Sequence, residues 1–404
     1  MPIVVQKYGG SSVANPEKVK QVAKRVVETQ ELGHSVVVVV SAMGKTTDEL
    51  LALSKAICPA PERRELDMLL TAGERISMAL LSMAIRDAGG ESISFTGSQA
   101  GILTNDRHVD AKIIEVRPIR VEDELARGKI VIVAGYQGMS YKREITTLGR
   151  GGSDTTAVAL AAALNAEWCE ICSDVDGVYT ADPRVVSDAQ RIPELSYEET
   201  QEMAESGAKV LNAQAVEFAK QAGIAIYARA TDGPLPGDDP TRDGTVVRKF
   251  LPAIPGSVSG VASEQSISLL NVETDDPSAL LSLMDQLEIG AKQVQILRKG
   301  SEKMQVSMVI SNENLHQNTT FEARLPEQFG DSAHLSADFG AVSVIGTGIN
   351  TNHHNLVRGI NALQGSEIRE VFTSSFRITW ILPTSEIENA VRSLHAEFVS
   401  ADES

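Results

Sequence analysis

Cysteine is scarce in this chain of 404 residues, which contains only 3. So few cysteines exclude a disulfide framework of the kind that holds small secreted proteins together. Cys169 and Cys172 form a Cys-x-x-Cys pair, but the stretch 166–173 is predicted to be a strand. Residues three apart on a strand point to opposite faces, so we expect structural thiols rather than a redox pair. This cysteine usage favours a reducing, cytoplasmic setting.

Aromatic residues and positive charge are also in short supply. Phe, Trp and Tyr make up 4% of the chain, and 37 Lys and Arg stand against 54 Asp and Glu, which gives a net charge of -17. A surface that binds duplex nucleic acid needs clustered Lys and Arg, so this balance argues against one. It does not exclude nucleotides, because a few backbone N–H groups and one lysine can hold them.

Long apolar runs and a secretory leader are not expected either. The N-terminal residues show no basic stretch followed by an apolar one, and no run approaches the ~20 apolar residues that span a bilayer. With 42% hydrophobic and 23% charged residues, the composition is that of an ordinary soluble globular protein. The length favours two or three domains of about 100 to 200 residues each.

Strands and helices alternate through residues 1–230. An apolar run at 3–8 is followed by a helix that Asn15 caps and Pro16 opens. Five valines at 36–40 indicate a strand covered on both faces, as in parallel sheets. Further strands are predicted at 92–95, 130–134, 168–173 and 224–228. Further helices are predicted at 62–87, from residue 153 onwards and at 197–222. One more helix is expected to begin with Thr46 or Thr47 as its N-cap. This alternation predicts an open, mostly parallel α/β sheet sandwiched by helices.

The composition changes at 232–265, where Gly, Pro and Asp predict loops and a linker. Beyond it, short strands surround single amphipathic helices. One set has strands at 267–272, 294–297 and 304–310 around a helix at 278–287, and the other has strands at 341–345, 368–372 and 376–382 around a helix at 355–363. We therefore expect a first domain over 1–245, a linker over 246–265 and two small α+β (ferredoxin-like) domains over 266–404, of a kind used for ligand sensing and dimerisation.

Two familiar phosphate-binding motifs are missing. Gly44-Lys45-Thr46 resembles the end of a P-loop, but Val39 stands where the motif requires its first glycine. No Gly-x-Gly-x-x-Gly follows a predicted strand. The 7 histidines show no metal-ligand spacing, so we predict no protein metal site.

Three polar segments are candidates for the chemistry. Residues 7–13, Lys-Tyr-Gly-Gly-Ser-Ser-Val, follow the first strand; paired glycines let backbone N–H groups approach a phosphate, although such a run also forms simple tight turns. Residues 146–154 form a Gly-rich turn that enters a helix and combines a guanidinium, suited to a carboxylate, with an aspartate. Residues 173–184 form a polar loop whose Asp-x-Asp-Gly lacks the later glutamate of a calcium loop.

Together these segments resemble the aspartate kinases of the amino-acid kinase superfamily. The motifs that carry the resemblance occur in order at 7–13, 41–44, 71–75, 94–101, 146–154 and 174–184. The resemblance is close over 1–230 and looser to the C-terminus. It implies transfer of the ATP γ-phosphoryl group, with Mg²⁺ accompanying ATP, to the side-chain carboxylate of L-aspartate. The product would be 4-phospho-L-aspartate, which leads towards lysine, threonine, methionine and isoleucine.

The resemblance also implies roles for individual residues. Lys7 would hold the transferring phosphate and Asp154 would orient Lys7, which makes these two the catalytic candidates. Glu74 would bind the substrate ammonium and Arg150 its α-carboxylate. The whole acceptor pocket would comprise Thr47, Glu74, Arg150, Gly151, Gly152 and Ser153. The residues implied in ATP binding are Lys7, Tyr8, Gly9, Gly10, Ser41, Ser173, Asp174, Tyr179, Arg184, Lys209 and Val210.

The C-terminal half resembles a pair of interleaved ACT domains, with which aspartate kinases sense amino acids such as lysine and threonine and assemble into dimers or larger homo-oligomers. Each usually opens its helix with Pro-Gly, but this chain has Asp275-Asp276-Pro277-Ser278 and Asn352-His353-His354-Asn355 instead. Since glycine takes positive φ most readily, we expect strain at Ser278 and Asn355. The candidate regulatory residues are Asp275, Ser278 and Asn355, and we expect feedback control to be weakened or altered.

Two other functions are compatible with some of these residues. A related kinase could phosphorylate another small acidic amino acid, because Glu74 and Arg150 fit any α-amino acid. A non-catalytic amino-acid-sensing ACT protein is disfavoured, because Lys7, Arg150 and Asp154 are all present.

Overall fold

The computed structural model describes residues 1–149, 151–208, 211–235, 237, 239–249, 254–287, 289–299, 303–312 and 318–399. The chain divides into two compact units. The first comprises Met1–Tyr179, Gln190–Ala204 and Lys209–Pro252, and the second comprises Thr180–Ala189, Glu205–Ala208 and Ala253–Ser404.

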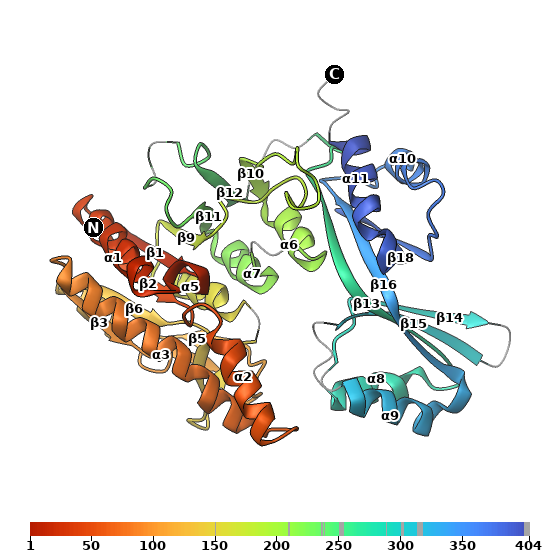
Figure 1. Ribbon diagram of the computed structural model, residues 1–404, viewed down its shortest axis with the longest axis horizontal. Helices are drawn as coiled ribbons and strands as arrows, with labels where there is room; N and C mark the ends of the chain where they lie inside the picture. The colour runs from red at the N-terminus through yellow and green to blue at the C-terminus, as the bar shows by residue number, and fades with distance from the viewer. Residues whose placement is uncertain are drawn as a thin grey trace. The chain divides into compact units, whose positions relative to one another are not determined.

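The first unit is built on an eight-stranded sheet with the strand order β10-β12-β11-β9-β1-β2-β6-β3 (Figure 1). Its strands are β1 (Ile3–Tyr8), β2 (Ser35–Val40), β3 (Ser92–Phe95), β6 (Ile130–Ala134), β9 (Trp168–Ser173), β10 (Glu194–Ser196), β11 (Ala225–Ala230) and β12 (Gly244–Arg248). All neighbours are parallel except β11 and β12. The predicted, mostly parallel α/β sheet is therefore confirmed.

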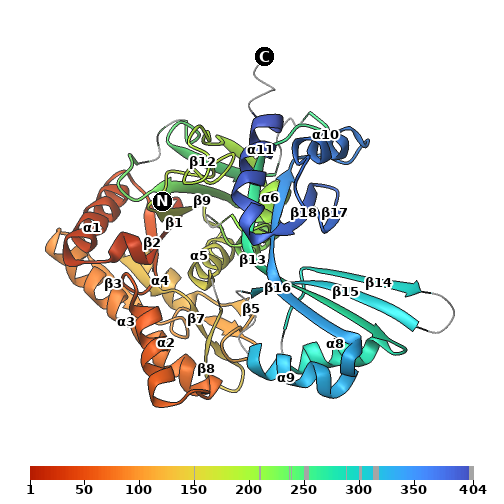
Figure 2. The same ribbon diagram turned by 45° about the vertical axis from the view of Figure 1, so that its right-hand side comes forward.

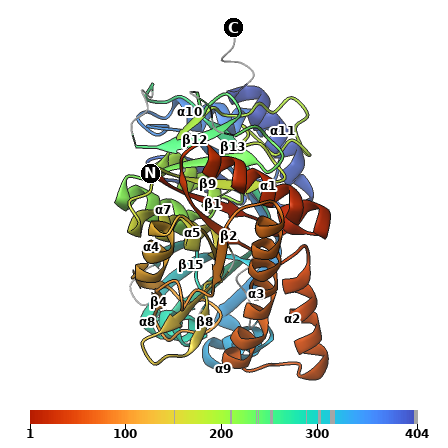
Figure 3. The ribbon, with the colours of Figure 1, turned by 90° about the vertical axis from the view of Figure 1, so that its left-hand side faces the viewer.

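Helices cover both faces of this sheet (Figure 3). They are α1 (Pro16–Glu31), α2 (Thr46–Ile57), α3 (Arg63–Asp87), α4 (Ile119–Ala126), α5 (Gly152–Ala163), α6 (Tyr197–Glu205) and α7 (Ala213–Ala222). Val36, Val38 and Val40 pack with α1 and α3 on one face, whereas α5 contacts β1, β2 and β9. The five valines at 36–40 are all fully buried, as expected for a strand covered on both faces.

Helix α3 is long and apolar enough to cross a membrane when judged by length and composition alone, and it is the one such helix in the described residues. The expectation concerned uninterrupted apolar runs, and Glu74 and Arg75 interrupt the apolar stretch of α3. Within the first unit, α3 packs against α1, α2, β3 and β6 and buries the carboxylates of Asp67 and Glu74. These contacts are those of a core helix.

A second, four-stranded sheet in the first unit has the order β5-β4-β7-β8. Its strands are β4 (Ile102–Thr104), β5 (Ile113–Val116), β7 (Gln137–Ser140) and β8 (Ile145–Thr147). None of these four strands was predicted from the sequence, because they are too short to show a period. This sheet brings the loop at 105–112 beside β8, where Ala111 N donates to Thr147 O at 2.8 Å.

The single helix predicted at 197–222 is wrong, because the structure has two helices, α6 and α7, in this range. Gly207 lies between them with a φ of 105°, which a continuing helix does not allow. Asn212 then caps α7, since its side chain accepts hydrogen bonds from the N–H groups of the first turn.

The second unit contains a six-stranded sheet with the order β14-β15-β13-β16-β18-β17, antiparallel throughout. Its strands are β13 (Gly260–Thr274), β14 (Gln293–Lys299), β15 (Lys303–Ser311), β16 (Ala333–Ile345), β17 (Glu370–Thr373) and β18 (Arg377–Pro383). Residues 260–264 of β13 pair with 341–345 of β16, and 267–272 pair with 333–339 across a register shift. The two long strands β13 and β16 therefore pair with each other in both halves of this sheet, as the interleaved ACT pattern implies.

Two helices accompany each end of these long strands (Figures 1 and 2). Helices α8 (Pro277–Gln286) and α9 (Asn318–Phe329) lie at one end, and α10 (His354–Ala362) and α11 (Ile387–Phe398) lie at the other. Separate apolar cores lie under the two pairs, around Phe321 and Trp380 respectively. The sequence predicted one helix per set, so α9 and α11 were missed.

Candidate active site

The carboxyl ends of β9, β1, β2 and β6 lie side by side at one edge of the first unit's sheet, because these strands are parallel neighbours. Backbone hydrogen bonds join the turns that follow them. Gly9 N donates to Cys172 O at 3.3 Å, Ser41 N to Tyr8 O at 3.1 Å, and Gly135 N to Val40 O at 2.9 Å. Ligands of open α/β sheets bind at this kind of edge.

Lys7 and Asp154 form an ion pair at this edge. Lys7 Nζ lies 2.7 Å from Asp154 Oδ1, and the two side chains are only 12% and 11% exposed. Lys7 lies one residue before the end of β1, and Asp154 lies in the first turn of α5. A carboxylate near a helix N-terminus is stabilised by the helix dipole, so Asp154 is a favourable anchor for the lysine.

Two glycines permit the close packing of the turns around this pair. A Cβ on Gly10 would lie 2.8 Å from Ala42 O, so no other residue fits between the β1 and β2 turns without movement. Gly151, the N-cap of α5, has a φ of 70°, and a Cβ there would lie 2.8 Å from Asn212 Cβ. Asn212 was not predicted as part of the site, because it is close to this turn only in the folded chain.

Glu74 presents a buried carboxylate that is only half satisfied. The residue is 3% exposed, and its Oε1 accepts a hydrogen bond from Ala42 N at 3.0 Å. Its Oε2 has no hydrogen-bond partner among the described residues. Burial raises the pKa of Glu74 to about 7, although the Ala42 N–H partly opposes the shift. A hydrogen-bond donor to Oε2 is the partner that this arrangement lacks.

Thr47 and Ser153 lie on the first turns of α2 and α5. Ser153 is 7% exposed, and a Cβ on Gly135 would lie 2.6 Å from its Oγ. The prediction that Thr46 or Thr47 caps α2 is wrong: the N-cap is Lys45, which makes no side-chain cap. Thr46 Oγ1 instead donates to the carbonyl of the preceding turn. Arg150 lies outside the described residues, so the structure does not test its predicted position.

The loop after β9 carries the next predicted residues. Ser173 Oγ accepts from Val175 N at 3.2 Å, Asp174 is exposed, and Tyr179 Oη donates to Asp176 Oδ1 at 2.7 Å. The side chain of Tyr8 instead lies in the core between β1 and α1, fully buried. Lys7 points to the opposite face of β1, so Tyr8 faces this edge through its backbone alone, and its role in ATP binding stays a prediction.

The other residues predicted to bind ATP are Arg184, Lys209 and Val210, and the structure does not test their predicted roles. Arg184 belongs to the second unit, where its guanidinium pairs with Asp182 at 2.7 Å and is 83% exposed. Lys209 and Val210 lie outside the described residues.

A buried polar network beside the site was missed by the sequence analysis. Arg25 of α1 donates to Glu170 of β9 at 2.8 Å, and Arg229 of β11 lies 3.8 Å from the same carboxylate. Ser12 and Thr231 hydroxyls lie 2.6 Å apart, which joins the β1 turn to the segment after β11. No sequence spacing signals these contacts, because their partners are far apart in the chain.

The candidate regulatory residues do not have the predicted backbone. Asp275 and Ser278 are exposed, and neither Ser278 nor Asn355 has positive φ, so the expected strain is wrong. Ser278 lies in the first turn of α8, and its N–H donates to Asp276 Oδ1 at 3.0 Å. Asn355 is buried in α10, and its Nδ2 donates to Gly256 O at 3.0 Å. Both positions are ordinary helical residues with satisfied polar groups.

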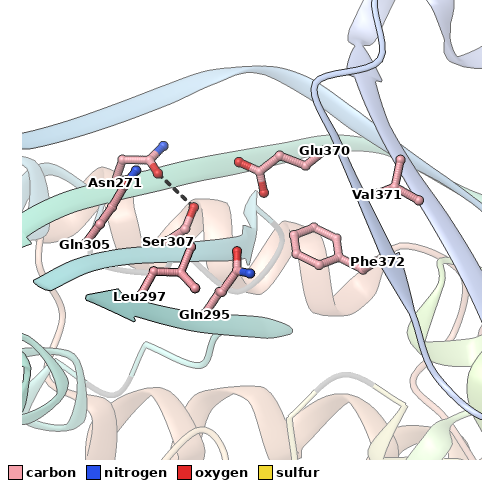
Figure 4. A pocket seen from close by; sticks show the side chains of 8 residues that line it. All are labelled: Asn271, Gln295, Leu297, Gln305, Ser307, Glu370, Val371 and Phe372. Carbon is pink, nitrogen blue, oxygen red and sulfur yellow. Dashed lines mark hydrogen bonds between the residues drawn. The ribbon is translucent and has the colours of Figure 1, made fainter. Parts of the chain in front are cut away.

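A pocket of about 290 Å³ lies in the second unit (Figure 4). It is lined by Asn271, Gln295, Leu297, Gln305, Ser307, Glu370, Val371 and Phe372. Ser307 Oγ donates to Asn271 Oδ1 at 2.7 Å, and burial raises the pKa of Glu370. None of the predicted catalytic residues lines it. We assign the chemistry to the first unit, where Lys7, Asp154 and Glu74 meet the turns at the sheet edge.

Comparison with known proteins identifies the family. Residues 2–228 match the amino acid kinase family. An aspartokinase of Mycolicibacterium smegmatis is 43% identical over 420 residues, which cover 98% of this chain and 96% of the relative. The chain belongs to the aspartokinase family. The aspartokinase of Corynebacterium glutamicum is 41% identical over 98% of this chain and 96% of its own.

Solved structures of other aspartokinases have the same fold. Aspartokinase III of E. coli, in complex with aspartate and ADP, gives a TM-score of 0.82 at 25% identity and covers 98% of this chain and 99% of its own. The aspartate kinase of Synechocystis gives 0.55 at 33% identity, over 98% of this chain and 69% of its own. The family and fold that the sequence motifs implied are confirmed.

Proposed function

We propose that this aspartokinase transfers the γ-phosphoryl group of ATP to the side-chain carboxylate of L-aspartate, which gives 4-phospho-L-aspartate. The observation that carries the proposal is the convergence of three groups at one sheet edge. The Lys7–Asp154 ion pair lies beside the Gly9–Gly10 turn, and the half-satisfied carboxylate of Glu74 lies against the next turn.

The acceptor needs orientation rather than activation by a base. A carboxylate is ionised at neutral pH, so catalysis depends on alignment and on neutralising the charge of the phosphates. Lys7, held by Asp154, would neutralise the transferring phosphoryl oxygens. The free oxygen of Glu74 would accept the ammonium of aspartate. The residues proposed for its α-carboxylate are Arg150, Gly151, Gly152 and Ser153, with Thr47 completing the pocket.

The nucleotide would lie across the turns after β1 and β9. The residues proposed for ATP binding in the first unit are Lys7, Tyr8 through its backbone, Gly9, Gly10, Ser41, Ser173, Asp174, Tyr179, Lys209 and Val210; Arg184, in the second unit, is proposed on the resemblance alone. Mg²⁺ would travel with the phosphates and spread their charge. The described residues contain no group of three or more His, Cys, Asp and Glu side chains that could hold a metal by themselves.

The test is turnover by the purified full-length chain. ADP release is measured in a coupled assay with L-aspartate, D-aspartate and L-glutamate, and the acyl phosphate is trapped as its hydroxamate. The proposal requires turnover that is selective for L-aspartate. A preference for L-glutamate would indicate a kinase that acts on another acidic amino acid. If no acceptor is turned over, the result would favour a non-catalytic, amino-acid-sensing protein.

We further propose that the first unit is the catalytic domain and the second an amino-acid-sensing domain through which copies of the chain associate. Feedback by lysine or threonine would be weak or altered. The support is that the Ser278 N–H at the start of α8 is already bonded to Asp276, whose negative charge also repels an effector carboxylate. A cytoplasmic location fits the unpaired cysteines, Cys58, Cys169 and Cys172.

A further inference from the structure

One buried carboxylate outside the residues assigned above joins three segments of the first unit. Asp67 of α3 is fully buried. Its carboxylate lies 2.6 Å from His108 Nδ1 and accepts hydrogen bonds from Thr147 Oγ1 at 2.6 Å and from Val109 N at 3.1 Å. His108 and Val109 belong to the loop at 105–112, and Thr147 ends β8. Removing the carboxylate would leave the buried Thr147 hydroxyl and the partly buried Val109 N–H without this acceptor.

Asp67 holds the loop in a conformation that it would not favour alone. Val109 has a φ of 73°, and β-branched residues are rarely found in this left-handed region. The Val109 N–H is bonded to Asp67 Oδ1, which compensates part of the strain. Strained residues persist only where the surrounding structure fixes them, and they are concentrated at functional sites.

The loop in turn lies against the Gly-rich turn that precedes α5. A Cβ on Gly149 would lie 2.9 Å from Asp110 Oδ1 and 3.5 Å from Val109 O. Gly149 has a φ of 75°, so this turn is itself left-handed at its contact with the loop. Movement of the loop would therefore be transmitted directly to the turn.

Asp67 and Glu74 are seven residues apart on α3, which is about two helical turns, so their side chains lie on the same face. Glu74 contacts the turn after β2 through Ala42 N. One rigid helix thus sets the position of the proposed ammonium-binding carboxylate and, through Asp67, the position of the turn before α5.

We propose that Asp67 is a positioning residue of the acceptor site, an inference that rests on the proposed aspartate kinase activity. Through the loop at 105–112 and β8 it fixes Gly149, which precedes α5, and the α-carboxylate of aspartate is proposed to bind at the start of α5. Asp67 touches neither substrate. Its removal weakens the binding of aspartate and leaves that of ATP unchanged.

Steady-state kinetics of four variants test this role. Asp67→Asn and Thr147→Val weaken the hydrogen bond between Asp67 and Thr147, whereas Thr147→Ser keeps the hydroxyl. The control Asp106→Asn changes an outward carboxylate of the same loop, which pairs with Lys142. We expect Asp67→Asn and Thr147→Val to raise the KM for aspartate about 10- to 100-fold, as small misplacements of a site can. The KM for ATP and kcat should stay within about threefold of wild type. Thr147→Ser and Asp106→Asn should resemble wild type.

Two further measurements separate positioning from a general loss of structure. The double variant Asp67→Asn/Thr147→Val should raise the KM no further than the more severe single variant, because both remove the same contact. All kinetics are measured below the melting temperature found by circular dichroism. If Asp67→Asn does not fold, the comparison of the KM for aspartate between Thr147→Val and Thr147→Ser decides whether this contact positions the acceptor site.

Asp67 would be a purely structural residue if Asp67→Asn raised the KM for aspartate and the KM for ATP equally. The same would follow if Asp67→Asn lowered the melting temperature and left the KM for aspartate unchanged. Either result would overturn the inference. A wild-type chain that does not turn over L-aspartate would instead refute the proposed function. That outcome is seen before any variant is compared, so the two failures are distinguishable.

Discussion

Glu74 should make the binding of aspartate depend on pH in the neutral range. Burial raises the pKa of its carboxyl from an ordinary 4.5 to about 7, so the free protein contains both protonated and ionised Glu74 near neutral pH. Only the ionised form can pair with the ammonium of aspartate. Binding therefore requires the loss of a proton below about pH 7 and no proton change well above it.

The size of the effect follows from this shift. A displacement of about 2.5 pKa units corresponds to roughly 3 kcal/mol between the two protonation states. We expect the KM for L-aspartate to rise about tenfold for each pH unit below 7 and to level off above about pH 8. The carboxylates and ammonium of free aspartate do not titrate in this interval, so the dependence belongs to the protein.

The assay is a series of KM measurements for L-aspartate at saturating ATP, from about pH 6 to 8.5. Glu74→Gln should have a high KM at every pH and no slope, whereas Glu49→Gln, an exposed carboxylate in the first turn of α2, should keep the wild-type profile. A wild-type KM that is constant over this range, or a Glu74→Gln variant that keeps the slope, would refute the reasoning.

The same shift acts in the opposite direction on stability. Because the folded-state pKa of Glu74 lies above its unfolded value, the folded state binds the proton more tightly, and its stability falls as the pH rises from about 4.5 to 7. The loss is at most roughly 3 kcal/mol. Without aspartate, Glu74→Gln should therefore raise the melting temperature at about pH 8 and change it little below about pH 5.

Three other changes test separate parts of the molecule. Lys7→Met should lower kcat at least about 100-fold with a modest change in the KM for aspartate, because the lysine contacts charge that moves in the transition state; a kcat near wild type would remove it from the mechanism. Gly10→Ala should lower the unfolding free energy by about 1–3 kcal/mol, because its Cβ would lie 2.8 Å from Ala42 O, and an unchanged melting temperature would contradict this packing. Lysine and threonine, titrated singly and together, should inhibit weakly; sub-millimolar inhibition would contradict the view that Asp276 occupies the effector position.

The sequence predicted those parts of the fold whose pattern is local and repeated. The valines at 36–40, the cap and proline at the start of α1, and the Gly-rich turns at 9–10 and 151–152 all follow from short-range rules, and the structure has each of them. The short strands of the four-stranded sheet were missed because three or four residues are too few to reveal an alternation.

What the sequence could not predict depends on contacts between distant segments. Glu74 could have been a surface carboxylate, and only the folded chain shows that it is 3% exposed. The same holds for Asp67 and for the Arg25–Glu170 pair. The prediction of backbone strain at Ser278 was wrong for another reason. The absence of the usual glycine does not cause strain there, because Ser278 is helical and Asp276 caps the first turn of α8.

The two long strands of the second unit have a consequence for how the chain folds. Because β13 and β16 each contribute to both halves of the six-stranded sheet, neither half is complete until residues 61 to 85 positions apart have paired. Such pairing carries a high loop-closure cost and slows folding relative to local structure. Neither half could be excised as an autonomous fragment, since a cut that isolates one half removes strands from the other. The second unit should therefore unfold in a single cooperative step, and a ligand that stabilises one half would protect the amides of the other from hydrogen exchange.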